Sequence, residues 1–156
     1  MNLALFEPDI PQNTGTIMRL CACLGVALDI IEPCGFLLTD KNLKRAGMDY
    51  LDHLNMTRHA NWEAFKATAL KKRIVLLTTK TAMPYADFKF SQDDILLLGR
   101  ESTGVPDHIH SAVTARITIP MTANMRSLNV AVAAAMVLGE ALRQTGSFPQ
   151  AHGQNQ

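Results

Sequence analysis

Short runs of consecutive apolar residues recur along the chain, and each one ends in Gly, Pro or polar residues. Such runs suit strands that are buried on both faces of a parallel sheet better than half-exposed strands, which alternate apolar and polar positions. The clearest run is 74–79, Ile-Val-Leu-Leu-Thr-Thr. Similar runs predict strands over 2–6, 26–31, 95–98 and 116–119, and residues 50–59 read as a weak edge strand or a loop.

Apolar residues at helical spacing alternate with these runs. One such pattern predicts a helix that Asn13 or Thr14 caps and that Gly25 ends, and Asn61 should cap another helix that reaches about Leu70. Further helices are expected over 39–45, 107–111 and 127–143. The alternation of strands and helices predicts an α/β fold with a mostly parallel sheet flanked by helices.

The chain has 156 residues, 47% of them hydrophobic and 19% charged, which is an ordinary composition for one domain with a real core. No linker or internal repeat divides it, so we expect one domain over 1–146 and a disordered tail over 147–156. No apolar run is long enough for a transmembrane helix, and Glu7 and Asp9 follow Met1 where a signal peptide would be basic. We therefore expect a cytoplasmic protein that does not bind membranes.

Cysteine content and charge narrow the possible partners. The three cysteines match no zinc pattern, so reduced core thiols and no metal site are expected. The net charge of +1 argues against binding to nucleic acid through bulk electrostatics. Any RNA binding must therefore come from local clusters of basic residues. One candidate is the basic run Lys41, Lys44 and Arg45, which is either a solvated helix face or a patch that contacts phosphate.

The segment 119–130 is the most unusual connector in the chain. It joins a predicted strand to the last predicted helix and contains two Met residues, an Arg, a Ser and an Asn. Ser127 could cap the helix that follows it, but capping by Ser127 explains neither Arg126 nor Asn129. We therefore interpret this segment as part of an active site.

A glycine-bearing loop, 99–104, follows the strand over 95–98. Its glycines have the spacing of a Walker A loop, but Val105 and Pro106 stand where that loop needs Lys and Ser or Thr. No G-x-G-x-x-G follows the first strand, and no Ser or Cys lies in a nucleophile elbow. Nucleotide hydrolysis at a P-loop and nicotinamide chemistry are therefore disfavoured, and strand-end loops with backbone donors and apolar side chains remain.

Three motifs in this order resemble those of the SPOUT-class RNA ribose 2′-O-methyltransferases. They are Asn13-x-Gly15-x-x-x-Arg19, Gly99-x-Glu101-x-x-Gly104, and Ile119-Pro120-Met121 followed by Ser127-Leu128-Asn129. The chain from Leu3 to about Arg143 is similar to the single-domain branch that methylates the wobble nucleotide of certain tRNAs. That branch would have Pro at position 100 and Thr-Arg at 102–103, where this chain has Arg100, Ser102 and Thr103. The run 127–134 is nearer to relatives that modify ribosomal RNA or other tRNA positions.

The resemblance implies a deep trefoil knot in the C-terminal part of the sheet, which would bind S-adenosylmethionine and release S-adenosylhomocysteine. It also implies a homodimer in which each active site is completed across the subunit boundary. The cofactor-binding residues that it implies are Leu77, Thr78, Gly99, Glu101, Ile119, Met121, Ser127 and Leu128.

Methyl transfer from a sulfonium to a ribose hydroxyl is an in-line displacement that needs oriented partners and a route for the hydroxyl proton, but no metal. Arginine stays protonated, so we expect Arg19 to stabilise charge or orient a phosphate, and the general base is unassigned. Arg126 is a further candidate for tRNA phosphate. The resemblance implies these catalytic residues: Arg19, Asn13, Glu101, Ser127 and Asn129.

Two other functions are compatible with the same motifs. One is 2′-O-methylation of ribosomal RNA or of another tRNA position, and the other is a non-catalytic module that only binds RNA.

Overall fold

The computed structural model describes residues 1–39 and 50–150. Six parallel strands form one sheet in the order β3-β2-β1-β5-β4-β6. In this order β1 and β5 are the two central strands, with β2 and β3 on one side and β4 and β6 on the other. The strands are β1 Asn2–Phe6, β2 Ala27–Ile31, β3 Met56–His59, β4 Ile74–Leu77, β5 Ile95–Leu98 and β6 Ala115–Ile117.

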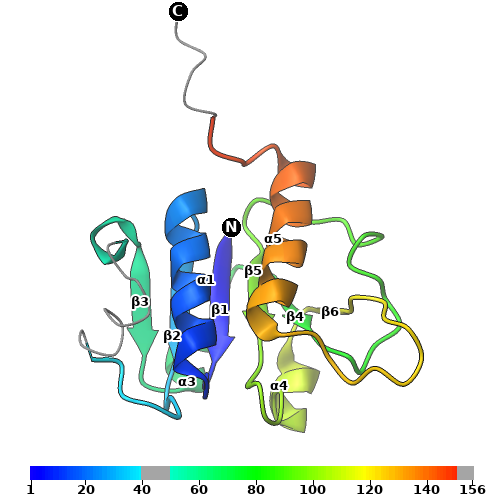
Figure 1. Cartoon of the computed structure of the whole chain (residues 1–156), viewed down its shortest axis with the longest axis horizontal. Coiled ribbons are helices and arrows are strands. Elements are labelled where there is room, and N and C mark those ends of the chain that lie inside the picture. Colours follow the sequence, from blue (N-terminus) through cyan, green and yellow to red (C-terminus); the bar gives the residue numbers. More distant parts are fainter. Residues whose placement is uncertain (40–49, 151–156) are drawn as a thin grey trace, which may run out of the picture.

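Helices cover both faces of this sheet and make a three-layer α/β/α fold (Figure 1). One face carries α1 Pro11–Leu24 and α5 Val130–Thr145, which contact each other, and the opposite face carries α3 Trp62–Thr68 and α4 Asp107–Ala112. A short 3₁₀ helix, η1 Leu51–His53, precedes β3. The expected α/β class with a parallel sheet is confirmed.

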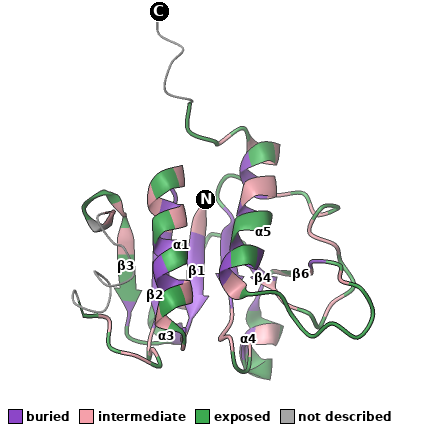
Figure 2. Ribbon diagram, in the orientation of Figure 1, coloured by how far each residue is buried: buried purple, intermediate pink, exposed green. Residues whose placement is uncertain are grey.

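Strands β4 and β5, and β1 after Asn2, are apolar throughout because both of their faces are covered. Along β1, Leu3 and Leu5 belong to the apolar cluster under α1 and α5, whereas Ala4 and Phe6 belong to the cluster under α3 and α4. Successive strand residues point to opposite faces, so an uninterrupted apolar run serves both layers. Figure 2 shows the resulting buried sheet between helices whose outer faces are exposed.

The first helix begins earlier than the sequence predicted. Pro11 is its first residue, Ile10 is the N-cap residue, and no side chain caps this end. The prediction of Asn13 or Thr14 as the cap was wrong, because proline lacks an N–H and its fixed φ suits the first helical position. At the other end, Gly25 adopts the left-handed conformation with φ 64°, so the predicted glycine stop is confirmed.

The predicted N-cap residue is correct for α3 but not for α5. The carboxamide oxygen of Asn61 accepts a hydrogen bond from the Ala64 N–H at 2.9 Å, which confirms the predicted cap, although α3 already ends at Thr68. The last helix begins at Val130, and its cap is Asn129. The prediction that Ser127 caps this helix was therefore wrong, because the backbone of Asn129 is still non-helical, with ψ 134°, and the helix starts three residues later than expected.

Other boundaries moved by a few residues. The fourth strand stops at Leu77, the sixth spans 115–117, and the ambiguous stretch 50–59 holds both η1 and β3. Residues 40–45 of the helix expected over 39–45 lie outside the described residues, as do residues 151–156 of the predicted tail. Residues 147–150 belong to no helix or strand.

The three cysteines form no disulfide, but they are not all buried in the core as expected. All three are free, but only Cys21 is buried, while Cys34 is half-buried and Cys23 is exposed, so the prediction of core thiols fails for Cys23. Burial raises the pKa of the Cys21 thiol to about 12.

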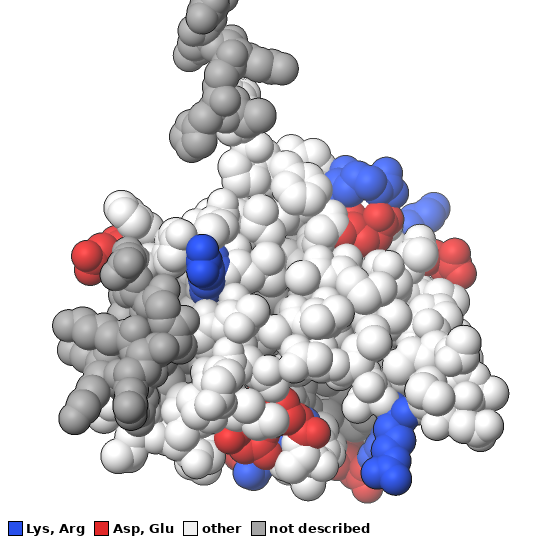
Figure 3. All heavy atoms as spheres, in the orientation of Figure 1, with Lys and Arg blue, Asp and Glu red and all other residues white. Residues whose placement is uncertain are grey.

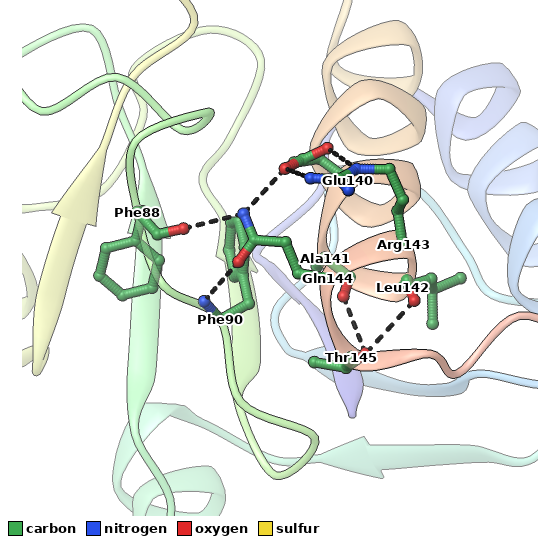
Figure 4. Close-up of polar contacts among 8 residues, drawn as sticks. All are labelled: Phe88, Phe90, Glu140, Ala141, Leu142, Arg143, Gln144 and Thr145. Carbon is green, nitrogen blue, oxygen red and sulfur yellow. Dashed lines mark hydrogen bonds and ion pairs between the residues drawn. The ribbon is translucent and has the colours of Figure 1, made fainter.

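The long connection from β4 to β5 is fixed to the end of α5 (Figure 4). The carboxamide of Gln144 accepts the N–H of Phe90 at 3.1 Å and donates to the carbonyl of Phe88 at 3.0 Å. The same Gln144 nitrogen donates to Glu140 at 2.8 Å, and the two phenyl rings meet edge to face. This connection begins at residues that line the cavity described below, so Gln144 helps to hold that wall in place.

Candidate functional site

A cavity of about 520 Å³ lies at the carboxyl ends of β4, β5 and β6. Four segments surround it, namely 76–80, 98–105, 118–121 and 126–133, together with the start of α1 and His110 of α4. Open parallel sheets bind ligands at this edge, and the volume is in the range of small-molecule sites.

The structure brings most of the predicted site residues to this cavity. All eight residues expected to bind the cofactor line it: Leu77, Thr78, Gly99, Glu101, Ile119, Met121, Ser127 and Leu128. Asn13, Asn129 and Arg126 line it as well. Arg19 does not line it, and Lys41, Lys44 and Arg45 lie outside the described residues.

The glycines of the 99–104 loop serve a tight turn. Arg100 and Gly104 exchange two backbone hydrogen bonds at 2.9 and 3.0 Å, and Gly104 has φ 71°, which favours glycine. A Cβ on Gly99 would lie 2.6 Å from the carbonyl carbon of Gly104, so only glycine fits there. The Walker-like spacing therefore reflects a backbone crossing that presents residue 101 at the cavity.

A chain of side-chain hydrogen bonds joins the three motifs. Asn13 donates through Nδ2 to Glu101 Oε1 at 3.2 Å, and Asn129 donates through Nδ2 to Asn13 Oδ1 at 2.9 Å. The second oxygen of Glu101 accepts the backbone N–H of Asp9 at 3.1 Å. Residues separated by 88 and 116 positions in sequence are thus fixed relative to one another at one wall of the cavity.

Asn129 also starts the last helix. Its Oδ1 accepts the N–H groups of Ala131 at 2.9 Å and Val132 at 3.2 Å, while its Nδ2 reaches Asn13. One carboxamide therefore caps α5 and links two motifs. The sequence contained a signal for this cap, because Asn is among the preferred N-cap residues and directly precedes the apolar, Ala-rich run.

Asp9, which the sequence analysis did not select, forms an acidic pair with Glu101. The pKa of Asp9 is lowered to about 2, chiefly by the hydrogen bond with the Glu101 side chain, and further by the Ser102 hydroxyl, the Glu101 N–H and Arg100. The pKa of Glu101 is raised, first by burial and then by its bond to Asp9.

Arg100 and Ser102, two departures from the motif of the resembling branch, hold the glycine loop to the loop after β1. Arg100 Nη1 lies 3.1 Å from Glu7 Oε2, and its Nε lies 3.6 Å from Asp9 Oδ2. The Ser102 hydroxyl donates to the Asp9 carboxylate, and the Glu101 N–H donates to the same carboxylate at 3.1 Å. Opposite charges meet here because β1 and β5 are neighbours, which the sequence alone did not indicate.

Arg19 lies on the exposed side of α1, away from the cavity of its own chain. Its Nη2 donates to the Tyr50 hydroxyl at 3.2 Å, and its guanidinium carbon lies 4.8 Å from the centre of the Tyr50 ring. The structure therefore separates Arg19 from the four other predicted catalytic residues, which all line the cavity.

The cavity suits a molecule with a flat apolar ring and a polar remainder. Leu77, Ile119, Met121 and Leu128 supply apolar walls, while Thr78 and the 99–104 loop add polar groups. His110 lines the same cavity, and its buried Nε2 has no hydrogen-bond partner among the described residues. These features fit S-adenosylmethionine, which carries an adenine base and polar hydroxyl, amino and carboxylate groups.

Two other kinds of site were sought within residues 1–39 and 50–150. No group of three or more His, Cys, Asp or Glu side chains lies there in an arrangement that could hold a metal ion. None of the described helices is both long enough and apolar enough to cross a membrane.

Known proteins resemble the chain over nearly all of its length. The family model described as "SpoU rRNA Methylase family" matches residues 1–139. A protein of Beijerinckia indica subsp. indica named tRNA (cytidine(34)-2′-O)-methyltransferase is 60% identical over 148 residues, which are 94% of this chain and 92% of that protein. A protein of the same name from Escherichia coli (strain K12) is 43% identical over 148 residues, with 94% of each chain covered.

Solved structures resemble it to a similar extent. One described as "Structural insights into the 2-OH methylation of C/U34 on tRNA" has a TM-score of 0.86 and 38% identity, covering 92% of this chain and 94% of that chain. An AdoMet-bound rRNA methyltransferase from Sinorhizobium meliloti has a TM-score of 0.83 and 26% identity, covering 91% of this chain and 55% of that chain. The sheet and the helices around the cavity are therefore shared with enzymes that methylate RNA.

Proposed function

The chain belongs to the SpoU rRNA methylase family, and from this we propose that it transfers a methyl group from S-adenosylmethionine to the ribose 2′-hydroxyl of nucleotide 34, the wobble nucleotide, of a tRNA. The observation that carries the proposal is the cavity at the carboxyl ends of β4 to β6, where the three motifs meet. The names of its curated relatives support cytidine at position 34 as the acceptor, and the description of one similar solved structure adds uridine. We expect this activity in the cytoplasm, where tRNA is used.

The residues assigned to the cofactor divide into walls and polar contacts. Leu77, Ile119, Met121 and Leu128 would enclose the adenine, and Thr78, Gly99 and Ser127 would supply polar groups around the rest of the molecule. When bound, the cofactor supplies an electrophilic methyl group on a sulfonium, and S-adenosylhomocysteine is the product. A cavity that excludes water and fixes the methyl group in line with the hydroxyl is what such a displacement requires.

The Glu101–Asn13–Asn129 chain is assigned to positioning. Both oxygens of Glu101 already accept N–H donors, from Asp9 and Asn13, so this carboxylate is poorly placed to remove the proton of a ribose hydroxyl. Its role in the proposal is to hold the loop 99–104 and Asn13 at a fixed distance from Asn129. Ser127 lines the same cavity and would orient the substrate, and the general base is not assigned.

We further propose that the active enzyme is a homodimer in which Arg19 of one protomer serves the cavity of the other. Arg19 does not line the cavity of its own chain, so a second copy would have to supply it. The face that carries α1 and α5 shows few charged side chains (Figure 3). Exposed apolar side chains lie along the start of α5 and the loop before it, namely Met125, Leu128, Val132 and Met136.

A mixing experiment tests this arrangement. Arg19→Ala and Glu101→Ala proteins should each be inactive, and subunit exchange between them should restore roughly one quarter of wild-type activity, since half of the dimers are mixed and each has one intact site. Complementation requires that the two residues come from different protomers. If the mixture stays inactive while sedimentation shows that mixed dimers have formed, the shared site is refuted.

The trefoil knot implied by the resemblance also remains a proposal. Its support is the order of the sheet, because β6 lies at the far edge beyond β4 while α5, which follows it in sequence, packs against α1. The chain must therefore return across β4 and β5 after β6. We propose that it does so through the connection between β4 and β5, and that the knotted segments form the cofactor site.

The activity is tested by incubating the protein with labelled S-adenosylmethionine and total RNA and then mapping the labelled nucleotide. Label at the 2′-oxygen of nucleotide 34 of particular tRNAs is expected. Label in ribosomal RNA or at another tRNA position would instead support the alternative substrates. Cofactor binding by calorimetry without any transfer would support the non-catalytic RNA-binding module.

A matched variant tests the role of Arg19. Arg19→Ala should abolish methyl transfer in single-turnover assays while cofactor affinity stays near that of the wild type, because Arg19 is assigned to the ribose or its phosphate and not to the cofactor. Methyl transfer at the wild-type rate would exclude the assigned role.

A further inference from the structure

Arg19 differs from most arginines of the described chain in what it contacts. Four other arginines form ion pairs with carboxylates: Arg58, Arg73, Arg100 and Arg143. For Arg19 the contacts are instead with a neutral side chain, because Tyr50 supplies both a hydroxyl acceptor and an aromatic face. No ion pair joins Arg19 to an Asp or Glu among residues 1–39 and 50–150.

The two contacts to Tyr50 restrict different motions of the guanidinium. The hydrogen bond from Nη2 to the Tyr50 oxygen, 3.2 Å long, fixes one edge, and the ring centre 4.8 Å from the guanidinium carbon fixes the plane. An exposed arginine otherwise samples many rotamers, and ordering it costs conformational entropy. A planar aromatic partner removes part of that cost before any ligand arrives.

Tyr50 is itself anchored. It immediately precedes η1, and its carbonyl accepts the backbone N–H of His53 at 3.1 Å. The η1 helix packs against α1, which carries Arg19. Tyr50 is therefore tied through its backbone to η1, which is adjacent to the helix that carries Arg19.

From this geometry we propose that Tyr50 is a positioning residue that orients Arg19 toward the ribose-phosphate of the RNA. Within residues 1–39 and 50–150 the partner of Arg19 is neutral, so no carboxylate there competes with a phosphate for the same donors. Among the described residues only the Tyr50 hydroxyl accepts a hydrogen bond from the Arg19 guanidinium, and we propose that its other N–H groups bind the RNA. The inference rests on the proposed function, since it assigns an orientation to Arg19 within that site.

Two variants of Tyr50 separate the contacts. Tyr50→Phe keeps the ring and removes the hydroxyl, so the single-turnover rate at saturating cofactor should fall roughly two- to tenfold, the value of one exposed hydrogen bond. Tyr50→Leu removes both contacts and should lower the rate by a further factor of about two to five. The cofactor dissociation constant should not change for either variant, because Tyr50 does not line the cavity.

Tyr85→Phe is the matched control, because Tyr85 is the only other tyrosine of the chain and does not line the cavity. It should leave the rate unchanged. A cycle with Arg19→Lys adds a second readout: Tyr50→Leu should reduce the rate by a smaller factor in that background, because an ammonium lacks the planar fork that the ring orients.

The outcomes are distinguishable. A wild-type protein that transfers no methyl group to tRNA refutes the proposed function, and the role of Tyr50 falls with it. A wild-type protein that is active while Tyr50→Phe and Tyr50→Leu keep its rate refutes the positioning role alone. Lower thermal stability of the variants at an unchanged rate does the same, since a purely structural residue would behave in that way. If Tyr50→Leu does not fold, Tyr50→Phe decides the matter.

Discussion

Replacing Asn129 by Ala removes two interactions at once, and their sizes follow from the structure. The Asn129 oxygen caps α5 by accepting the N–H groups of Ala131 and Val132, and loss of an N-cap costs about 1 kcal/mol. The bond to Asn13 at 2.9 Å is exposed, which places it near the lower end of the range of roughly 0.5–1.5 kcal/mol for one hydrogen bond. The expected loss of unfolding free energy is therefore about 1.5–2 kcal/mol.

For a domain of this size, such a loss lowers Tm by roughly 5–7 °C. Asn129→Asp is the informative partner variant, because Asp is as good an N-cap as Asn but has no N–H to donate to Asn13. Its unfolding free energy should stay within about 0.5 kcal/mol of the wild type. Its methyl transfer should nevertheless fall, since the link between two motifs at the cavity is lost.

Urea unfolding followed by circular dichroism measures the first effect, and single-turnover methyl transfer measures the second. Both variants should be inactive or strongly impaired, and only Asn129→Ala should be clearly less stable. If Asn129→Ala unfolds at the same urea concentration as the wild type, the assigned cap is wrong. If Asn129→Asp is fully active, the bond between Asn129 and Asn13 does not position the site.

The remaining predictions concern the neighbouring loops. Gly99→Ala should abolish cofactor binding measured by calorimetry, because its Cβ would lie 2.6 Å from the backbone of Gly104. The pKa of Asp9 is lowered to about 2, first by its interaction with the Glu101 side chain, so ionised Asp9 stabilises the fold above about pH 4. Acid titrations should show this contribution lost as the pH falls from about 4 to 2, and Asp9→Asn should lack that loss. Replacing the basic residues Lys41, Lys44 and Arg45 should weaken tRNA binding and reduce its dependence on salt concentration in filter-binding titrations. An unchanged salt dependence would show that these residues form a solvated helix face.

Local sequence patterns were sufficient for the elements and for most of the cavity. Uninterrupted apolar runs such as 95–98 indicate strands covered on both faces, and the glycines after them mark the strand ends where ligands bind. The strand and strand-end inferences depend only on neighbours in the chain, which is why they could be made without coordinates. The cofactor residues came instead from the resemblance of three motifs to a known family, and all eight of them line the cavity.

The first residues of the helices were harder to predict from the sequence, because several neighbouring residues could each act as the N-cap. Which of them does so depends on the backbone conformation. Proline at position 11 began α1 before Asn13, and Asn129 took the cap that Ser127 could have supplied. Asn13 is therefore not an N-cap and its side chain donates to Glu101, while Asn129 both caps α5 and donates to Asn13. No pattern in the sequence indicates these contacts.

By itself the sequence determined the α/β class and the positions of the strand ends, since both follow from short-range periodicity, and its resemblance to a known family identified the motif residues. Only the tertiary structure decided which charges meet. The placement of β5 beside β1 brings Arg100 and Glu101 against Asp9, across 91 and 92 positions of sequence. The packing of η1 against α1 places Tyr50 beside Arg19, which does not line the cavity. Strand order is a property of the whole sheet, so contacts that depend on it appear only when the chain has folded.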